Sequence, residues 1–342
     1  MTSPLRPMVT EAKQQAIGID IGGTKIAAGV IASDGTIIQA AAVPTPQRQD
    51  ALVQSILDTV SDLRRHHPGV IATGVGAAGI VDWPNGHIRW APNNTYQDLP
   101  LQQLLTEGTG LPAIVENDAN AAAWAEATVG AGAGLSNIIG MTIGTGIGAG
   151  LILNRELHRG DTGIAGEVGH MLVNPSGGEQ CGCGTNGCLE ALASGTALGR
   201  AGRKAAAENP AGQLARLAGG ADKVTGETVH QAARAGDPAA RELFDQIGYW
   251  LGIGIASLAN VFDPQIVILG GGLAATGDLL LRPTRESFER HIFAPAHRKL
   301  PPLAPAQLGP EAGLIGAALL ALHQYARPAI PKPTSPSPVL AM

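Results

Sequence analysis

"AIGIDIGGTKIAAGVIASDGTIIQAAAV", residues 16–43, indicates the type of fold at the start of this chain. It contains three apolar runs, separated by the glycine turn at 22–23 and by Asp34-Gly35. Apolar runs separated by Gly-Gly or Asp-Gly are typical of antiparallel strands joined by hairpins. The segment therefore predicts three hairpin-connected strands, with a glycine turn between the first two.

A second stretch repeats this pattern. "NIIGMTIGTGIGAGLILNREL", residues 137–157, again predicts strand, glycine turn, strand. Between and after the two stretches, helical spacing alternates with buried runs. Helices are expected at 50–65, 119–129, across 189–262 and at 311–325, and strands at 70–81, 112–117 and 265–272. The pattern predicts an α/β fold with two similarly built domains and a cleft between them. We expect domains at 16–128 (with the final helix 311–325) and 129–310, and disordered ends at 1–15 and 327–342.

The bulk composition excludes several classes of protein. The chain has 342 residues, 44% hydrophobic and 15% charged, with a net charge of −5. A mildly acidic chain without a basic block gives no electrostatic attraction to nucleic acid or to an anionic membrane. The first 15 residues lack the apolar core of a secretory signal, and the apolar run 247–262 is too short to span a bilayer. We therefore expect a cytoplasmic protein.

Both glycine turns suit phosphate binding. The turns are Asp20–Lys25 ("DIGGTK") and Ile143–Gly148 ("IGTGIG"). Glycines have no Cβ, so backbone N–H groups can approach phosphate oxygens closely. Asp20 would repel a phosphate unless a cation, expected to be Mg²⁺ acting through water, lay between them. Alternatively, the glycines simply make tight hairpins. A third glycine run, Leu269–Leu273, would let a nucleoside lie against bare backbone.

A carboxylate lies where a predicted strand gives way to a helix. Glu116, Asn117 and Asp118 precede the alanine-rich segment 119–129. One interpretation is that Asn117 or Asp118 only caps this helix. The other is that Asp118 faces the cleft as a general base, with its pKa lowered by the helix N-terminus. Such a weak base suits phosphoryl transfer, where orienting the nucleophile matters more than early proton removal.

All three cysteines lie within "GHMLVNPSGGEQCGCGTNGCLE", residues 169–190. Cys181, Cys183 and Cys188 together with His170 form the Cys₃His set that holds tetrahedral zinc. Free buried thiols or a redox pair are the alternatives, but four glycines in the loop favour wrapping an ion. Four protein ligands leave no open position, so the zinc would be structural. It would hold His170 near Glu167 and Cys188 near Glu190.

These motifs together resemble the ROK-family sugar kinases, and within that family the bacterial glucokinases. The resemblance spans about residues 16–325 and rests on "DIGGTK", "GVGAAGIVD", "ENDANAAAWAE", "IGTGIGAGLILNRELHRGDTGIAGEVGH", "CGCGTNGCLE" and "LGGG". It implies the actin-like hexokinase fold, with ATP and Mg²⁺ in the interdomain cleft and phosphoryl transfer to a hexose O6. The expected product is glucose 6-phosphate.

The resemblance also implies a role for each site residue. Asp118 would be the catalytic base. Sugar contacts are expected from Asn93, Asn117, Asp118, Glu167, His170 and Glu190. Phosphate and nucleoside contacts are expected from Asp20, Gly22, Gly23, Thr24, Lys25, Gly144, Thr145, Gly146, Gly270, Gly271 and Gly272. The zinc ligands would be His170, Cys181, Cys183 and Cys188.

Other activities remain open at the level of sequence. "APNNTYQDLPL" carries Thr95-Tyr96 where the glucokinases tend to have a small apolar residue and then Trp, so the sugar could also be mannose, fructose, N-acetylmannosamine or N-acetylglucosamine. Polyphosphate could replace ATP as donor. A sugar-responsive repressor of the same family is the alternative from another class, but the first glycine motif begins at Gly18, which leaves no room for a DNA-binding domain in front. The family also implies a homodimer or homotetramer.

Overall fold

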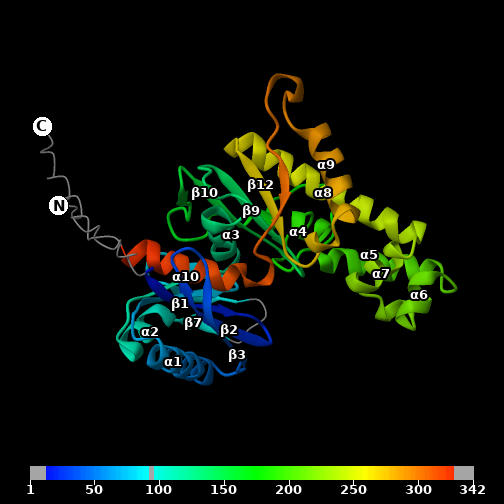
Figure 1. Cartoon of the computed structure of the whole chain (residues 1–342). Coiled ribbons are helices and arrows are strands. Elements are labelled where there is room, and N and C mark those ends of the chain that lie inside the picture. The colour runs from blue at the N-terminus through cyan, green and yellow to red at the C-terminus, as the bar shows by residue number, and fades with distance from the viewer. Residues whose placement is uncertain (1–12, 92–95, 327–342) are drawn as a thin grey trace, which may run out of the picture.

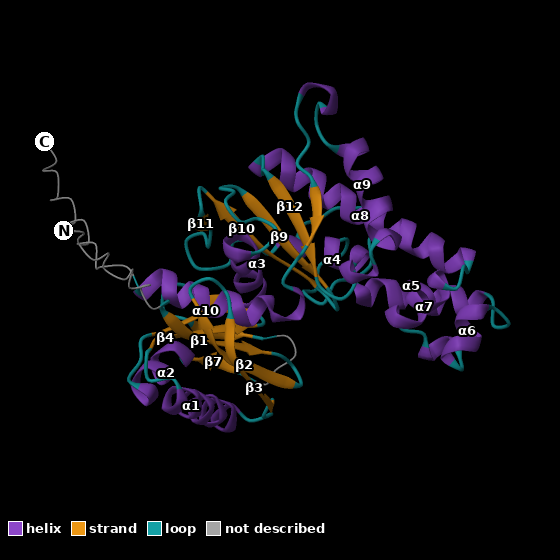
Figure 2. Cartoon of the chain, in the orientation of Figure 1, coloured by secondary structure: helices purple, strands orange, loops and turns teal. Residues whose placement is uncertain are grey.

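The computed structural model describes residues 13–91 and 96–326 and shows two five-stranded sheets, one in each half of the chain (Figures 1 and 2). The first consists of β1 (Gln15–Ile21), β2 (Lys25–Ala32), β3 (Ile37–Pro44), β4 (Val70–Ala77) and β8 (Ala113–Asn117). The second consists of β9 (Ile138–Ile143), β10 (Ile147–Leu153), β11 (Glu156–Leu157), β12 (Ile266–Gly270) and β13 (Leu303–Pro305). A small sheet is formed by β5 (Ile80–Asp82), β6 (His87–Trp90) and β7 (Gln97–Leu99).

The two large sheets have the same connectivity. Their orders are β3-β2-β1-β4-β8 and β11-β10-β9-β12-β13, with the first three strands of each half antiparallel and the other pairs parallel. In each sheet a glycine turn links the first two strands. Pairing ends at Ile21↔Ile26 in the first sheet and at Ile143↔Ile147 in the second. The predicted repeat of strand, glycine turn, strand is therefore confirmed.

Helices cover the sheets and fill the second half of the chain. They are α1 (Gln49–His66), α2 (Leu101–Thr109), α3 (Asp118–Val129), α4 (Leu189–Ala193), α5 (Gly195–Glu208), α6 (Gln213–Ala218), α7 (Gly226–Arg234), α8 (Pro238–Phe262), α9 (Asp278–His291) and α10 (Ala312–Tyr325). Short 3₁₀ turns lie at Val168–His170, Ala221–Lys223, Ala274–Thr276, Pro295–His297 and Gly309–Glu311. Within the described residues, no helix combines the length and the apolar character needed to span a bilayer.

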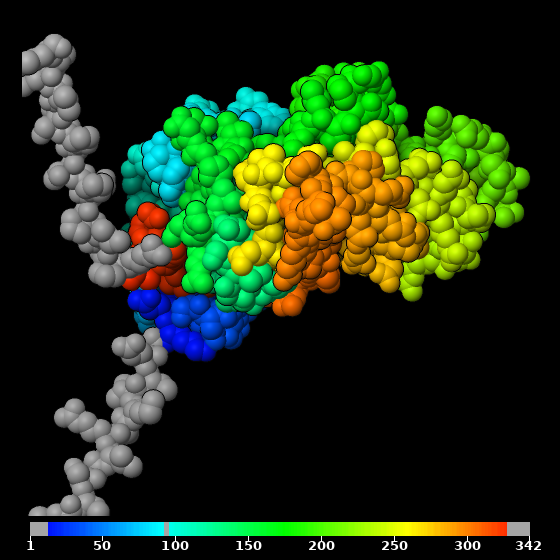
Figure 3. Space-filling view, turned by 90° about the horizontal axis from the view of Figure 1, so that it is seen from above, coloured from blue at the N-terminus to red at the C-terminus, as the bar shows by residue number. Residues whose placement is uncertain are grey.

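Two helices lie between the sheets and join the halves. α3 packs against β9 and β10, α10 packs against β1 and β4, and the two helices pack against each other (Figure 1). Figure 3 shows α10 beside the first strands, although the two are at opposite ends of the chain. A Cβ on Gly316 of α10 would lie 1.7 Å from the Ala121 carbonyl oxygen of α3. Small residues thus allow the backbones to approach, which explains a core poor in aromatic side chains.

The sequence predicted these central helices well and others less well. The expected helices 119–129 and 311–325 correspond to α3 and α10, and the apolar run 247–262 lies in α8, whose inner face is buried. Helices α2 and α9 and the small sheet were not predicted from the sequence. Gln15 begins β1, whereas residues 1–12 and 327–342 lie outside the described residues. The proposed domain boundary at 128/129 stays a prediction; α3, which ends there, contacts both large sheets.

Candidate active site

A pocket of about 880 Å³ brings most of the predicted sugar-binding residues together. Its wall includes the start of α3, the glycine turn between β9 and β10, and the loop that follows β11. The predicted residues that line it are Asn117, Asp118, Glu167, His170 and Glu190, together with Gly144, Thr145, Gly146 and Gly271. Asn93 lies outside the described residues.

Asn117 and Asp118 have different roles at the start of α3. The Asn117 side-chain oxygen accepts hydrogen bonds from the backbone N–H groups of Ala119 at 2.9 Å and Asn120 at 3.1 Å, so Asn117 is the N-cap. Asp118 lines the pocket. Burial raises the pKa of the Asp118 carboxyl, although the Ala119 N–H at 2.8 Å acts against this. The expectation that the helix N-terminus lowers this pKa is wrong, because desolvation outweighs the hydrogen bond.

Asp118 also lines a smaller cavity of about 200 Å³, together with Asp20. Burial, followed by the charge of Asp118, raises the pKa of Asp20 from 3.8 to about 6. Gly313 in the first turn of α10 leaves room for this carboxylate, since a Cβ there would lie 3.0 Å from it. Of the predicted nucleotide residues, Gly270 and Gly271 line the same cavity.

The first glycine turn is a tight hairpin. The Gly22 N–H donates to the Lys25 carbonyl at 3.0 Å, and Thr45 Oγ1 donates to the Gly22 carbonyl at 2.7 Å. Gly22, Gly23, Thr24 and Lys25 are not part of the walls of the two cavities around Asp118. Both interpretations of this turn are compatible with such a hairpin, so its contact with phosphate stays a prediction.

The second glycine turn is fixed by the residues around it. The Gly195 N–H donates to the Gly144 carbonyl at 2.7 Å, and Thr196 Oγ1 donates to the Thr145 carbonyl at 2.8 Å. Glu190 Oε2 accepts the Ile147 N–H at 2.9 Å, and a Cβ on Gly146 would lie 2.4 Å from that oxygen. A larger residue at 146 would therefore displace the Glu190 carboxylate from this contact. A third cavity of about 610 Å³ is lined by Gly144, Thr145 and Gly272.

The four predicted metal ligands form one cluster. The ligand atoms of His170, Cys181, Cys183 and Cys188 all lie within 4.8 Å of one another. The Cys183 and Cys188 sulfurs are 3.7 Å apart, and His170 Nδ1 is 3.6 Å from the Cys181 sulfur. His170 Nε2 faces the other way, 3.9 Å from Glu167 Oε2. Burial raises the pKa of Cys188 to about 12, so this thiol ionises near neutral pH only beside a cation.

One buried ion pair close to the pocket was not predicted from the sequence. Arg159, which follows β11, donates through Nε to Glu116 Oε2 at 2.5 Å. Nothing in the local pattern distinguishes Arg159 from a surface arginine. Glu116 was noted only as the neighbour of Asn117 and Asp118.

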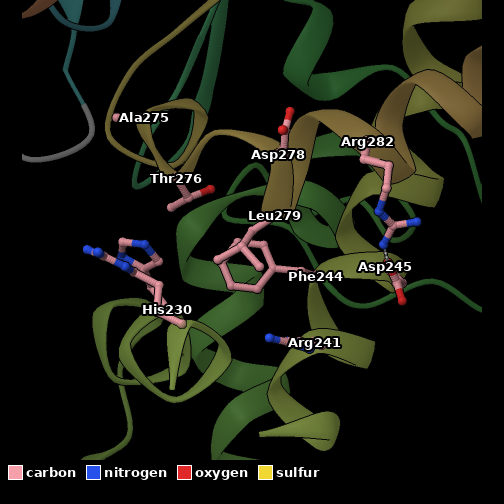
Figure 4. Close-up of a pocket in the computed structure, with 10 residues that line it drawn as sticks. His230, Arg241, Phe244, Asp245, Ala275, Thr276, Asp278, Leu279 and Arg282 are labelled. Atoms are coloured by element: carbon pink, nitrogen blue, oxygen red, sulfur yellow. Dashed lines mark hydrogen bonds and ion pairs between the residues drawn. The ribbon is translucent and has the colours of Figure 1, made fainter. Parts of the chain in front are cut away.

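A further pocket lies in the helical part of the second half (Figure 4). Its wall contains three arginines, one of which forms ion pairs with acidic side chains. Arg282 pairs with Asp245 at 2.8 Å, the contact dashed in Figure 4, and with Glu286 at 3.0 Å. The predicted residues around Asp118 are not part of its wall.

The chain is similar to glucokinases of known sequence and known structure. The glucokinase of Streptomyces coelicolor is 44% identical over 308 residues, covering 89% of this chain and 96% of the relative. The crystal structure of a ROK family glucokinase from Streptomyces griseus with glucose and AMPPNP matches with a TM-score of 0.79 at 44% identity, covering 90% of this chain and 99% of that one. The likeness confirms the predicted actin-like α/β fold.

A relative of another class is also similar. The xylose repressor of Caldicellulosiruptor bescii is 31% identical over 299 residues, covering 84% of this chain and 74% of the relative.

The ROK family model itself matches residues 16–324, nearly all of the described chain. With its repeated glycine-turn sheets and its Cys/His cluster beside a carboxylate-lined pocket, this chain belongs to the ROK family.

Proposed function

We propose that this protein transfers the γ-phosphoryl group of ATP to O6 of glucose. One observation carries the proposal: Asp118 lines both the pocket that holds Glu167, His170 and Glu190 and the cavity that holds Asp20. A carboxylate at this junction can reach a sugar hydroxyl on one side and a phosphate on the other. The similarity to glucokinases, one of them solved with glucose and AMPPNP, supports this choice of substrates.

The chemistry assigned to Asp118 is that of a general base. The hexose O6–H donates its proton to the Asp118 carboxylate, O6 bonds to the γ-phosphorus of ATP, and the bond from that phosphorus to the bridging oxygen breaks to release ADP. The transition state is loose, so orienting O6 contributes more than its early deprotonation. A raised pKa brings the Asp118 carboxylate closer to the working pH, which makes it a better proton acceptor.

The pocket wall supplies groups for the other sugar hydroxyls. The Glu167 and Glu190 carboxylates would accept hydrogen bonds from sugar hydroxyls. His170 Nε2, the ring nitrogen near Glu167, would be available for a further sugar contact. Asn117 would offer the sugar a single donor. Its oxygen caps α3 and its amide donates to the Gly79 carbonyl at 3.1 Å, so one N–H remains for sugar. Asn93 stays a predicted sugar contact.

The nucleotide is assigned to the second glycine turn, which lines the same pocket as the sugar-binding groups, and to the two neighbouring cavities. Gly144, Thr145 and Gly146 would face the phosphates, and Gly270, Gly271 and Gly272 would face the nucleoside. Asp20 would hold Mg²⁺ through water, and the buried carboxylate pair Asp20 and Asp118 suits a divalent cation. When bound, Mg²⁺ neutralises charge on the transferred phosphoryl group.

The Cys/His cluster fits structural zinc. A tetrahedron with Zn–S bonds of about 2.3 Å has edges of about 3.8 Å. Two of the separations, 3.7 Å between the Cys183 and Cys188 sulfurs and 3.6 Å between His170 Nδ1 and the Cys181 sulfur, match this spacing, and all four ligand atoms lie within 4.8 Å of one another. His170, Cys181, Cys183 and Cys188 would fill all four positions, so the metal would stabilise the loop that holds His170 and Glu190 beside the sugar.

The decisive test is Asp118→Asn. We expect turnover with glucose and ATP to fall at least about 10²-fold, because the amide cannot accept the O6 proton. Glucose binding, measured by calorimetry, should persist, since Asn keeps the size of the side chain. Near-normal turnover in this variant would rule out the assigned role.

The identity of the sugar and donor needs a separate assay. A panel of glucose, mannose, fructose, N-acetylmannosamine and N-acetylglucosamine, with ATP or polyphosphate as donor, would identify the preferred pair. Because the relatives include a xylose repressor, a gel-shift assay belongs in the same panel. Sequence-specific DNA binding without phosphorylation of any sugar would favour a repressor. The homodimer or homotetramer and the cytoplasmic location stay predictions.

A further inference from the structure

The buried ion pair between Glu116 and Arg159 connects the two halves of the chain. Glu116 is the second-last residue of β8, directly before Asn117 and Asp118, and Arg159 follows β11 of the other sheet. The Glu116 side chain is 4% exposed and that of Arg159 is 15% exposed. Both charges are therefore largely removed from water, which costs free energy unless every polar atom is paired.

The Glu116 carboxylate is almost fully used. Its Oε2 accepts the Arg159 Nε–H, and its Oε1 accepts the Asn117 backbone N–H at 3.0 Å and the Asn120 side-chain N–H at 2.9 Å. Asn117 and Asn120 lie on either side of Asp118. Glu116 thus fixes the position of the backbone around Asp118, the proposed base.

Arg159 fastens the loop that leads to Glu167. Its guanidinium carbon lies 3.8 Å from the centre of the Trp83 ring, a cation–π contact with the first half of the chain. Its carbonyl accepts the Ala165 N–H at 3.1 Å, and the Trp83 N–H donates to the Thr162 carbonyl at 3.1 Å. The loop is therefore held to the first half at both Arg159 and Thr162.

The far end of this loop has little freedom. Gly166 has φ +101°, and a Cβ there would lie 2.8 Å from the Ala149 carbonyl oxygen. Glu167, the next residue, lines the sugar pocket, whereas neither Glu116 nor Arg159 is part of the pocket wall. The ion pair does not line the pocket, but each partner is connected to a group that does. Glu116 directly precedes Asn117 and Asp118, and Arg159 begins the loop that leads to Glu167.

We infer that Arg159 is a positioning residue, which through Glu116 and Trp83 sets the distance between the Asp118 side of the pocket and Glu167. The inference rests on the proposed function, since it assumes that these two carboxylates hold the same hexose. It assigns hexose affinity to Arg159 and leaves nucleotide affinity independent of it. A shift of about 1 Å in such a site can cost about 10²-fold in rate.

The test compares three variants with the wild-type protein in steady-state assays. Arg159→Gln should raise the KM for glucose about 10-fold or more and change the KM for ATP less than about 2-fold, because misplacing Glu167 weakens only the sugar contacts. Arg159→Lys keeps the charge but loses the planar group that pairs with Glu116 and stacks on Trp83. Its KM for glucose should therefore lie between those of the wild type and Arg159→Gln. The control is Arg155→Gln, an exposed arginine of the same segment whose Nε–H donates to Ser136 Oγ at 3.1 Å, a contact within the second half.

A double variant keeps the test valid if Arg159→Gln folds poorly. Glu116→Gln with Arg159→Gln leaves no unpaired buried charge, and its effect on the glucose KM should be smaller than the product of the two single effects. Calorimetric titration with glucose and with AMPPNP gives the same comparison without turnover.

Unchanged glucose affinity in a folded Arg159→Gln protein would overturn the inference. So would an equal loss of glucose and nucleotide affinity, which a purely structural role would produce. Failure of the proposed function has a different signature, because the wild-type protein itself would then phosphorylate no hexose.

Discussion

At the scale of single residues, the site holds two carboxylates that repel each other. Asp20 and Asp118 line one small cavity, and burial raises the pKa of both. Neither carboxylate gains enough hydrogen bonds in the free protein to offset its desolvation. Strain of this kind is expected where a divalent cation and a phosphate are later bound. The free protein therefore gives up stability for function at these two positions.

The pH dependence of stability tests this view through Asp20→Asn. With a pKa of 3.8 unfolded and about 6 folded, Asp20 binds more protons in the folded state between these values, so its contribution to stability is lost as pH rises through this window. This difference between the two pKa values corresponds to about 3 kcal/mol in the free energy of unfolding. In Mg²⁺-free buffer at pH 8, Asp20→Asn should be more stable than the wild type by up to about that amount, and the gain should vanish near pH 4.

The control for this prediction is Asp34→Asn. Asp34 is exposed, and its hydrogen bond with Lys13 lowers its pKa to about 2, so neutralising it should bring no gain at pH 8. Urea unfolding across pH 4–8 measures all three proteins. If Asp20→Asn were no more stable than the wild type at pH 8, the Asp20 carboxylate would not be a source of strain.

At the scale of elements, the cysteine loop lacks a hydrophobic core of its own. The loop from Leu172 to Cys188 is closed by two isolated β-bridges, Leu172↔Cys188 and Gln180↔Asn186. The buried cluster beneath it contains Cys181, Cys188 and Ala191. So small a cluster cannot order a glycine-rich loop, which is why we expect a bound ion to do so.

Cys183→Ser tests the role of this ion. The wild-type protein should contain one zinc per chain by elemental analysis, and the variant should lose both the zinc and glucose phosphorylation, because His170 and Glu190 are then no longer held beside the sugar. Ser176→Ala, an exposed position of the same loop outside the ligand set, is the matched control. A metal-free Cys183→Ser protein with full activity would contradict the positional role.

The sequence was informative about elements and ligands but not about contacts between distant segments. The hairpins at residues 22–24 and 144–146 and the Cys/His cluster depend on local spacing, which a single sequence displays. The pKa of Asp118 depends on how deeply the start of α3 is buried. The pairing of Arg159 with Glu116 joins two residues that are 43 positions apart in the sequence. Local sequence patterns do not show how deeply a helix is buried or which distant residues come into contact.

At the scale of the whole molecule, the halves share part of their core. One buried cluster takes Ala16 and Ile114 from the first sheet, Ile138 and Ile268 from the second, and the inner faces of α3 and α10. Each half also has a buried core of its own, but separate domains would have few contacts across their boundary, whereas here α3 and α10 join the two sheets. We therefore expect the described chain to unfold as one cooperative unit, although ligands bind between its halves.

Gly316→Ala tests this cooperativity, because it perturbs the contact where α10 meets α3. Alanine favours a helix over glycine by about 1 kcal/mol, but here its Cβ would lie 1.7 Å from the Ala121 carbonyl oxygen. Overpacking should therefore dominate and lower the free energy of unfolding by about 1–3 kcal/mol. Urea curves from circular dichroism and from tryptophan fluorescence should coincide and shift together, whereas Gly69→Ala, with nothing within 4 Å, should leave them in place. Curves that separate, with only one of them displaced in Gly316→Ala, would show that the halves unfold independently and that the shared core does not couple them.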